Sequence, residues 1–205
     1  MNLSVVEIVG YLASALVVAS FAMKSVVRLR IVSLVGSIIF VVYGVMLGSI
    51  PLVITNAAAA GLNLWNLRRE FRPNRDLAAV QIAAGAPFLL DFLHSHHDDI
   101  VRFHPNFVEP EPGDFVRLLV RDGLPAGAVV GHPHGETLQL TLDYVMQAYR
   151  DSRIGSWLYG PGSKTFTDAG FTTIVAQPDS EAVRGYLTRI GFSATPRGLE
   201  LELRR

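Results

Sequence analysis

Residues 138–159, with the sequence LQLTLDYVMQAYRDSRIGSWLY, decide how the second half of the chain folds. The leucines at 138, 140 and 142 alternate with polar residues, which predicts a β-strand with one buried face. A basic loop with one glycine follows at residues 150–156, and apolar residues then return at helical spacing. A strand that leads through such a loop into a helix predicts an anion site, because the first N–H groups of a helix have no intrahelical acceptor.

This stretch resembles the coenzyme-A loop of the GCN5-related N-acetyltransferases (GNAT), in which Gln or Arg, two residues, Gly, one residue and Gly or Ala follow the fourth strand. Arg150 takes the first position and Gly155 the last, while Arg153 stands where the first glycine is expected. A plain strand–turn–helix with solvated charges is the alternative. The resemblance implies that the loop residues bind the pyrophosphate of acetyl-CoA; they are Arg150, Asp151, Ser152, Arg153, Ile154, Gly155 and Ser156.

Half of the 205 residues are hydrophobic, and the mean hydropathy is +0.33, but the apolar character is unevenly distributed. Most of it precedes Arg68, whereas nearly all acidic residues follow Glu70, which favours a membrane part followed by a water-soluble part. Lys plus Arg and Asp plus Glu are equal at 18 each, so the charge does not favour a nucleic-acid partner. The chain has no cysteine, which excludes a disulfide, a thiolate metal site and a cysteine nucleophile.

Apolar segments predict an α-helical membrane domain over residues 1–70, with three transmembrane helices in the lipid bilayer. The first helix is expected at about 4–23, just long enough to cross a bilayer. The uncharged run 31–67 is too long for one crossing, and the turn residues at 48–51 divide it into helices at 31–48 and 51–67. A buried helical core and a signal peptide are the alternatives, which the lack of polar helix faces and of leading positive charges disfavours.

Basic residues lie at two of the predicted helix ends, at residues 24–30 and 68–75. By the positive-inside rule, the N-terminus is therefore expected outside, and residues 68–205 in the cytoplasm. Cytoplasmic placement suits an enzyme that uses acetyl-CoA, which is a cytoplasmic metabolite.

The helical part resembles one half-unit of the SWEET and PQ-loop transporters, and still more the small YgjV-type proteins of the bacterial inner membrane. Gly10-Tyr11, Tyr43-Gly44, Pro51 and Asn56 carry this resemblance, although the Pro-Gln pair of the PQ-loop group is missing. The resemblance implies a homodimer in the bacterial inner (plasma) membrane, because such half-units need a second copy to enclose a path. Asn56 is either a site residue or, more simply, an interhelical hydrogen-bond partner.

Pro73-Asn74 predicts a linker over residues 71–79, and Asp76 is expected to cap a helix from Leu77 to about Ala84. A further helix is predicted over 87–103. Its histidines and aspartates at 94–99 suggest a metal site, but a polar helix end explains them as well. We expect no metal, because no further ligand motif is present.

The remaining pattern predicts a mixed, mostly antiparallel sheet with strands and helices in the order found in GNAT proteins. Gly191-Phe192, at the end of the last predicted helix, adds to the resemblance. The resemblance implies an α/β (α+β) GNAT-like acyltransferase domain over residues 80–205. The strands are expected at 115–121, 126–131, 137–146, 172–177 and 199–203, and the helices at 155–169 and 181–190.

The same resemblance implies a site at the end of the central strand. Backbone groups of Tyr144, Val145 and Met146 would pair with the pantetheine arm of acetyl-CoA, and the Val145 N–H is the candidate oxyanion donor. Asp143 is the candidate general base and Tyr186 the candidate general acid. A surface carboxylate is the alternative for Asp143. Packing is the alternative for Tyr186, which lies one residue, or about 100° of helix, before the expected position.

These expectations favour a membrane-anchored acetyltransferase that faces the cytoplasm and transfers an acetyl group from acetyl-CoA to an amine acceptor. One alternative is a small-solute transporter dimer of the half-SWEET kind with a non-catalytic soluble cap. The other is an acyl-CoA sensor that reports through the membrane helices.

Overall fold

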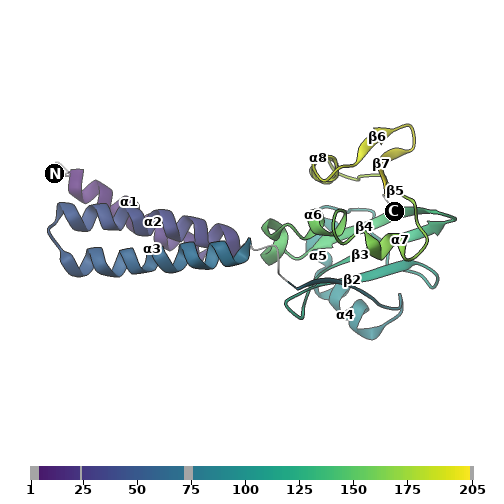
Figure 1. Ribbon diagram of the computed structural model, residues 1–205, viewed down its shortest axis with the longest axis horizontal. Helices are drawn as coiled ribbons and strands as arrows, with labels where there is room; N and C mark the ends of the chain where they lie inside the picture. Colours follow the sequence, from purple (N-terminus) through teal and green to yellow (C-terminus); the bar gives the residue numbers. More distant parts are fainter. Residues whose placement is uncertain (1–4, 24, 72–75, 204–205) are drawn as a thin grey trace. The chain divides into compact units, whose positions relative to one another are not determined.

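The computed structural model describes residues 5–23, 25–71 and 76–203, which belong to two compact units (Figure 1). The first unit comprises Met1–Asn74 together with the short segment Gln147–Ser152. The second comprises Arg75–Met146 and Arg153–Arg205.

The first unit contains the three predicted helices, α1 (Val5–Phe21), α2 (Val26–Met46) and α3 (Ile50–Glu70). Helix α2 packs against both α1 and α3. It begins earlier than predicted, because Ser25 caps it and its hydroxyl accepts a hydrogen bond from the Arg28 N–H. The predicted turn before Pro51 is present, with Gly48 in a left-handed conformation at φ +64°.

Close helix contacts in this unit depend on two glycines of α2. A Cβ atom at Gly36 would lie 2.9 Å from the Val17 Cγ2 atom of α1, and one at Gly44 would lie 2.9 Å from the Val53 Cγ2 atom of α3. Such small residues allow backbones to approach in membrane helix bundles. Asn56 donates its side-chain hydrogen bond to Leu52 O of its own helix, at 3.0 Å.

Among the described residues, Val26–Met46 is the one helix that is both long and apolar enough to cross a membrane, with a hydropathy of 2.1. Only 17% of its apolar window is buried within the structure, unlike the core helix of a water-soluble protein. The apolar part of α1, Val6–Phe21, is shorter.

The second unit is built on a mixed, mostly antiparallel sheet of seven strands, so the predicted α+β class is confirmed. The strand order is β1-β2-β3-β4-β5-β7-β6, and only β4 and β5 run parallel. The strands are β1 (Leu77–Gln81), β2 (Phe115–Arg121), β3 (Leu124–His134), β4 (Thr137–Val145), β5 (Thr173–Ala176), β6 (Ser193–Thr195) and β7 (Gly198–Glu202).

Short helices connect these strands, and one face of the sheet packs on α4 and α5 through Leu89, Leu93 and Ile100. The alternation of leucines in β4 places Leu138, Leu140 and Leu142 in buried positions, as predicted. The helices are α4 (Pro87–Ser95), α5 (His97–Val101), the 3₁₀ helix η1 (Gln147–Ser152), α6 (Ile154–Leu158), α7 (Lys164–Thr167) and α8 (Glu181–Arg189).

The predicted helix from Leu77 to Ala84 is wrong, because Leu77–Gln81 forms strand β1. This strand pairs antiparallel with β2, and Asp76 O accepts a hydrogen bond from the Asp122 N–H. Pairing with β2 therefore overrides the helix propensity of its alanines. Of the predicted linker 71–79, residues 72–75 lie outside the described residues, and residues 77–79 belong to β1.

Candidate active site

Strands β4 and β5 pair along only part of β4, because β5 ends at Ala176. Their parallel pairing runs from Thr137 opposite Thr173 to Leu140 opposite Ala176, and β4 then continues to Val145. A cleft of about 20 Å³, room for one or two water molecules, lies where this pairing ends. Its lining includes His104, Thr141 and Asp143, with Val183 and Leu187 of α8 and Asp179 from the residues before that helix.

The backbone of β4 directs alternate groups toward this cleft. The Met146 N–H donates to Ala126 O of β3 at 2.9 Å. Because backbone groups alternate in direction along a strand, the carbonyl of Asp143 and the N–H of Val145 face away from β3. The His104 Nε2 atom lies 3.3 Å from the Asp143 carbonyl oxygen. That oxygen can only accept, so Nε2 carries the proton.

The side chain of Asp143 lies at the centre of a tyrosine pair. Its Oδ2 atom accepts hydrogen bonds from the hydroxyls of Tyr159 and Tyr186, each at 3.0 Å. Its Oδ1 atom is shielded from solvent and has no hydrogen-bond partner among the described residues. The surface-carboxylate alternative for Asp143 is therefore wrong, because this carboxylate is enclosed by the two tyrosines.

Burial raises the pKa of Asp143, while the hydrogen bonds from both tyrosines and the nearby His104 act in the opposite direction. Burial also raises the pKa of the Tyr159 and Tyr186 hydroxyls, and the Asp143 charge raises both further. Both hydroxyls therefore stay protonated at neutral pH and act as hydrogen-bond donors. A hydroxyl with so high a pKa is a weak proton source, which favours positioning of Asp143 over general-acid catalysis as the role of Tyr186.

Gly155 makes room for the Tyr186 side chain. A Cβ atom on Gly155 would lie 1.9 Å from the Tyr186 hydroxyl oxygen, well inside van der Waals contact. The glycine that carries the motif resemblance is therefore required by packing against Tyr186. Tyr186 also reaches the site despite lying one residue early, so it does more than fill the core.

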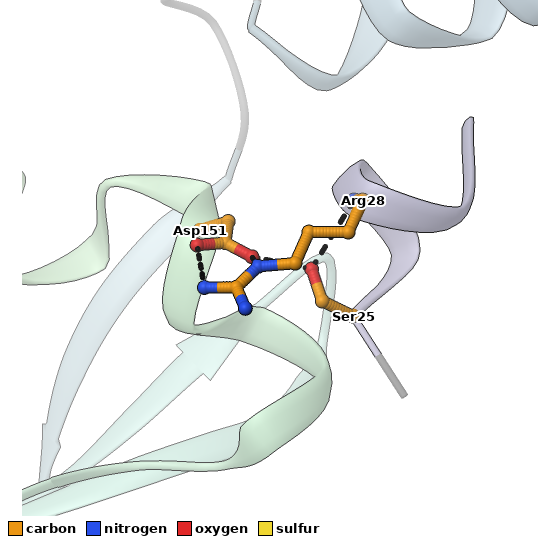
Figure 2. A network of polar contacts seen from close by, with 3 residues as sticks. All are labelled: Ser25, Arg28 and Asp151. Atoms are coloured by element: carbon orange, nitrogen blue, oxygen red, sulfur yellow. Dashed lines mark hydrogen bonds and ion pairs between the residues drawn. The ribbon is translucent and has the colours of Figure 1, made fainter. Parts of the chain in front are cut away.

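The predicted cofactor loop is divided between η1 and α6. Asp151 and Ser152 belong to η1, in the first unit, and their side chains bind the helices. Figure 2 shows the Asp151 contacts. The Asp151 carboxylate accepts from Arg28 Nε at 2.9 Å, from Arg28 Nη2 at 3.3 Å and from Ser25 Oγ at 2.6 Å. The Ser152 hydroxyl donates to Glu70 Oε1 at 3.2 Å.

Partial burial raises the pKa of Asp151, but the hydrogen bonds from Ser25 and Arg28 and the Arg28 charge together hold it below its ordinary value of 3.8. Arg150 also belongs to η1, and residues 153–156 lead into α6. Arg153 has φ +58°, so the position where a glycine is expected adopts the left-handed conformation with an arginine in it. Ile154 is buried, and Ser156 follows Gly155 on α6.

The other predicted residues of β4 divide between the two faces of the sheet. Tyr144 is buried against α4 and α5, and its hydroxyl donates to Asp99 Oδ2 at 2.9 Å. The Met146 N–H is used in pairing with β3, as described above. Val145 keeps the backbone orientation that the predicted oxyanion role needs.

Sequence reasoning missed two residues of this site, His104 and Tyr159. Tyr159 ends the stretch that decides the fold, but its distance from Asp143 depends on how α6 folds back on β4. His104 follows a cluster of more prominent histidines. His94 pairs with Glu109, and His132 pairs with Asp114. Within the part of the chain that the structure describes, no group of three or more potential metal ligands gathers.

Comparison with known proteins gives one relative by sequence. A protein of Haemophilus influenzae, described as uncharacterized, is 40% identical over 73 residues, which are 34% of this chain and 95% of that protein. This chain belongs to the same family as the Haemophilus influenzae protein. No family model matches the chain.

Several solved structures are similar to this chain, and three of them are the following. The first is assigned to the GNAT acetyltransferases of Desulfovibrio desulfuricans, with TM-score 0.45, 16% identity, and coverage of 62% of this chain and 98% of that one. The second is a GNAT family acetyltransferase of Elizabethkingia anophelis with acetyl-CoA bound, with TM-score 0.44, 16% identity, and coverage of 64% of this chain and 100% of that one. The third is a tandem GNAT protein of clavulanic acid biosynthesis, with TM-score 0.41, 15% identity, and coverage of 59% of this chain and 45% of that one.

Proposed function

We propose that the second unit is an N-acetyltransferase that transfers an acetyl group from acetyl-CoA to an amine acceptor. The observation that carries the proposal is the point where the pairing of β4 with β5 stops, at Leu140 and Ala176. Asp143 lies on the part of β4 that continues beyond the end of β5, and it lines the small cleft there. The order of strands and helices around this point also resembles the GNAT proteins. The acetyl-CoA-bound protein of Elizabethkingia anophelis illustrates the donor that we propose.

In the proposed reaction, Asp143 takes the proton that the acceptor ammonium must lose before its nitrogen can attack. Burial raises the pKa of this carboxyl toward the range in which a base works near neutral pH. Tyr159 and Tyr186 hold the carboxylate in place through Oδ2, which leaves Oδ1 for the proton. The Val145 N–H faces the side of β4 where an oxyanion would form.

Acetyl-CoA supplies the thioester. The neutral amine nitrogen adds to the thioester carbon and forms the new C–N bond, and the adduct loses its second nitrogen proton to solvent. The C–S bond then breaks, and the leaving sulfur takes a proton from solvent. The test is acetyl transfer by the purified full-length chain to a panel of primary amines, measured by release of free coenzyme A. Release that depends on an amine supports the proposal, and release with none of the amines contradicts it.

We further propose that the three helices of the first unit anchor the enzyme in the bacterial inner membrane as a homodimer, with the second unit in the cytoplasm. The apolar and largely exposed surface of α2 supports the anchor. The basic residues Arg28 and Arg30 at the start of α2, and Arg68 and Arg69 at the end of α3, support the orientation.

Cysteine labelling tests this orientation cleanly, because the chain has no native cysteine. We expect Ser49→Cys, at the turn between α2 and α3, to react with a membrane-impermeant maleimide added to intact cells. The matched variant Ser193→Cys, on an exposed residue of β6, should react only after the membrane is permeabilised. Labelling in the opposite order would contradict the proposed orientation, and equal labelling of both in intact cells would contradict the anchor.

An acyl-CoA sensor is the second candidate function, and the Asp151 contacts favour it. The segment Gln147–Ser152, which follows β4 after Met146, belongs to the helical unit. Its Asp151 binds Arg28 and Ser25 (Figure 2), and its Ser152 binds Glu70. A ligand that moved the end of β4 would therefore act on a segment that is bound to the helices. Coenzyme-A binding without acetyl transfer to any amine would favour the sensor over the enzyme.

The strength of this attachment can be measured by hydrogen exchange. We expect Asp151→Asn to speed amide exchange in residues 147–152 by roughly fivefold, because a partly exposed, bidentate ion pair contributes about 1 kcal/mol. The lowered pKa of Asp151 means that this protection is present above pH 3.8 and is lost as the pH falls below that value. Asp91→Asn, an exposed carboxylate of α4, is the control and should change nothing in this segment. Unchanged exchange in Asp151→Asn would contradict the attachment.

A further inference from the structure

The cleft between β4 and β5 is occupied at its polar edge by His104. The imidazole is 7% exposed, and its Nε2–H donates to the Asp143 carbonyl at 3.3 Å. This carbonyl lies just beyond the last residue pair of β4 with β5. An extended ligand that added to this strand edge would place its own N–H group on the same oxygen.

The loop that carries His104, residues 102–107, is also bound to the opposite wall of the cleft. The Asn106 Nδ2 group donates to Asp179 Oδ1 at 2.9 Å, and the Ser180 hydroxyl donates to Phe103 O at 3.2 Å. Asp179 lines the cleft, and Ser180 caps α8 by accepting from the Val183 N–H. The loop therefore spans the cleft from β4 to the start of α8.

Two of the three contacts, those of His104 and Asn106, are of kinds that break at low cost. The His104 bond to the carbonyl is long for an N–H···O hydrogen bond, and Asn106 and Asp179 are both exposed. Burial lowers the pKa of His104, while Asp143 and Asp179 act in the opposite direction, so the ring is neutral when it donates. Its departure therefore leaves no unpaired charge in the cleft.

We propose that residues 102–107 form a lid in which His104 is a displaceable plug, and that a ligand enters by replacing the His104 hydrogen bond on the Asp143 carbonyl. The inference rests on the proposed function, because coenzyme A is the ligand for which the lid would open. It explains why a cleft with room for one or two water molecules lies beside a carboxylate that is placed for catalysis. In this proposal, the His104 hydrogen bond competes with the ligand and lowers its affinity.

The lid is tested by calorimetric titration of coenzyme A into the full-length chain in detergent. We expect His104→Ala to bind about fivefold more tightly than the unaltered chain, because the ligand no longer has to break a protein hydrogen bond. His104→Gln keeps an N–H donor of similar reach and should bind as the unaltered chain does. Asn106→Ala, which removes one contact from the exposed side of the loop, should also bind more tightly, by a smaller factor. His94→Ala, an exposed histidine paired with Glu109, is the control and should change nothing.

The outcomes separate the lid from the proposed function. Tighter binding by His104→Ala, or binding by that variant alone, supports the lid. Equal or weaker binding by both His104→Ala and Asn106→Ala overturns the lid and leaves the acetyltransferase proposal intact. If neither the unaltered chain nor any variant binds coenzyme A, the proposed function fails and the lid fails with it. Thermal unfolding shows whether each variant is folded. If His104→Ala is unfolded, the affinity of Asn106→Ala for coenzyme A decides whether residues 102–107 form a lid.

Discussion

Asp143→Asn is expected to lower the rate of acetyl transfer by about 10²- to 10⁴-fold, the contribution that a positioned general base makes. The amide oxygen can still accept hydrogen bonds from Tyr159 and Tyr186, so the site keeps its shape. It cannot take a proton, so the acceptor amine is no longer activated. Steady-state release of coenzyme A at saturating amine measures the loss, and calorimetry should show nearly unchanged coenzyme-A binding.

The stability of the same variant gives an independent check on the environment of Asp143. Because burial raises the pKa of this carboxyl above its ordinary 3.8, the folded protein loses stability as the pH rises from that value toward the folded-state pKa. Asp143→Asn removes this loss, so the variant should unfold at the same or a higher temperature at neutral pH. A rate within threefold of the unaltered enzyme would contradict the base role, whatever the stability.

Tyr159→Phe distinguishes positioning from chemistry. It removes one of the hydrogen bonds that lower the pKa of Asp143, so that pKa should rise. The acidic limb of the pH–rate profile should then move to higher pH, with a smaller loss of maximal rate than in Asp143→Asn. A profile that loses height without moving would mean that Tyr159 has a packing role alone.

Gly155→Ala is expected to have the largest structural effect of any single methyl addition at the site. The new Cβ would lie 1.9 Å from the Tyr186 hydroxyl oxygen, so the tyrosine must leave Asp143. We expect a loss of about 1–3 kcal/mol of stability from overpacking, and a fall in acetyl transfer of tenfold or more. Denaturant unfolding and the coenzyme-A release assay measure the two effects.

Two further variants decide which function Gly155 serves. Adding Tyr186→Phe to Gly155→Ala removes the colliding oxygen, so the double variant should recover part of the lost stability. If Gly155 served chiefly to let a pyrophosphate approach, Gly155→Ala would weaken coenzyme-A binding and Tyr186→Phe would not rescue it. Gly185→Ala, in α8 with no atom within 4 Å of the added Cβ, is the matched control and should stabilise the protein by up to about 1 kcal/mol.

The alternation of apolar residues was sufficient to predict β4, and the long uncharged apolar segments were sufficient to predict the three helices of the first unit. In β4 the alternation of Leu138, Leu140 and Leu142 matches burial on one face, and such a pattern depends only on the chain's own geometry. Residues 77–81 were predicted to form a helix, but they form β1. A short alanine-rich segment carries little periodic signal, so its conformation is set by its pairing with β2.

The candidate site was predictable in its central carboxylate but not in its surroundings. Asp143 follows from its place on the polar face of β4, whereas its enclosure depends on Tyr159 and Tyr186, which arrive from α6 and α8. The helical phase of Tyr186 is fixed by the sequence, but the direction of α8 relative to β4 is set by tertiary packing. The role of His104 could not be predicted for the same reason, because its partner is a backbone carbonyl 39 residues away.

Two residues of the predicted cofactor loop have side-chain partners that the sequence did not predict. Asp151 and Ser152 found partners in Arg28, Ser25 and Glu70, residues more than 80 positions away, and sequence spacing gives no information about such contacts. Arg153 stands where the motif has a glycine, and it adopts the left-handed conformation that suits glycine best.

The central claim is that the gap between β4 and β5 receives acetyl-CoA. Hydrogen exchange of the full-length chain, with and without saturating acetyl-CoA, tests it most directly. The account predicts that amides of residues 141–146 become protected while those of the lid, residues 102–107, exchange faster. Protection confined to other parts of the chain, with residues 141–146 unchanged, would contradict it.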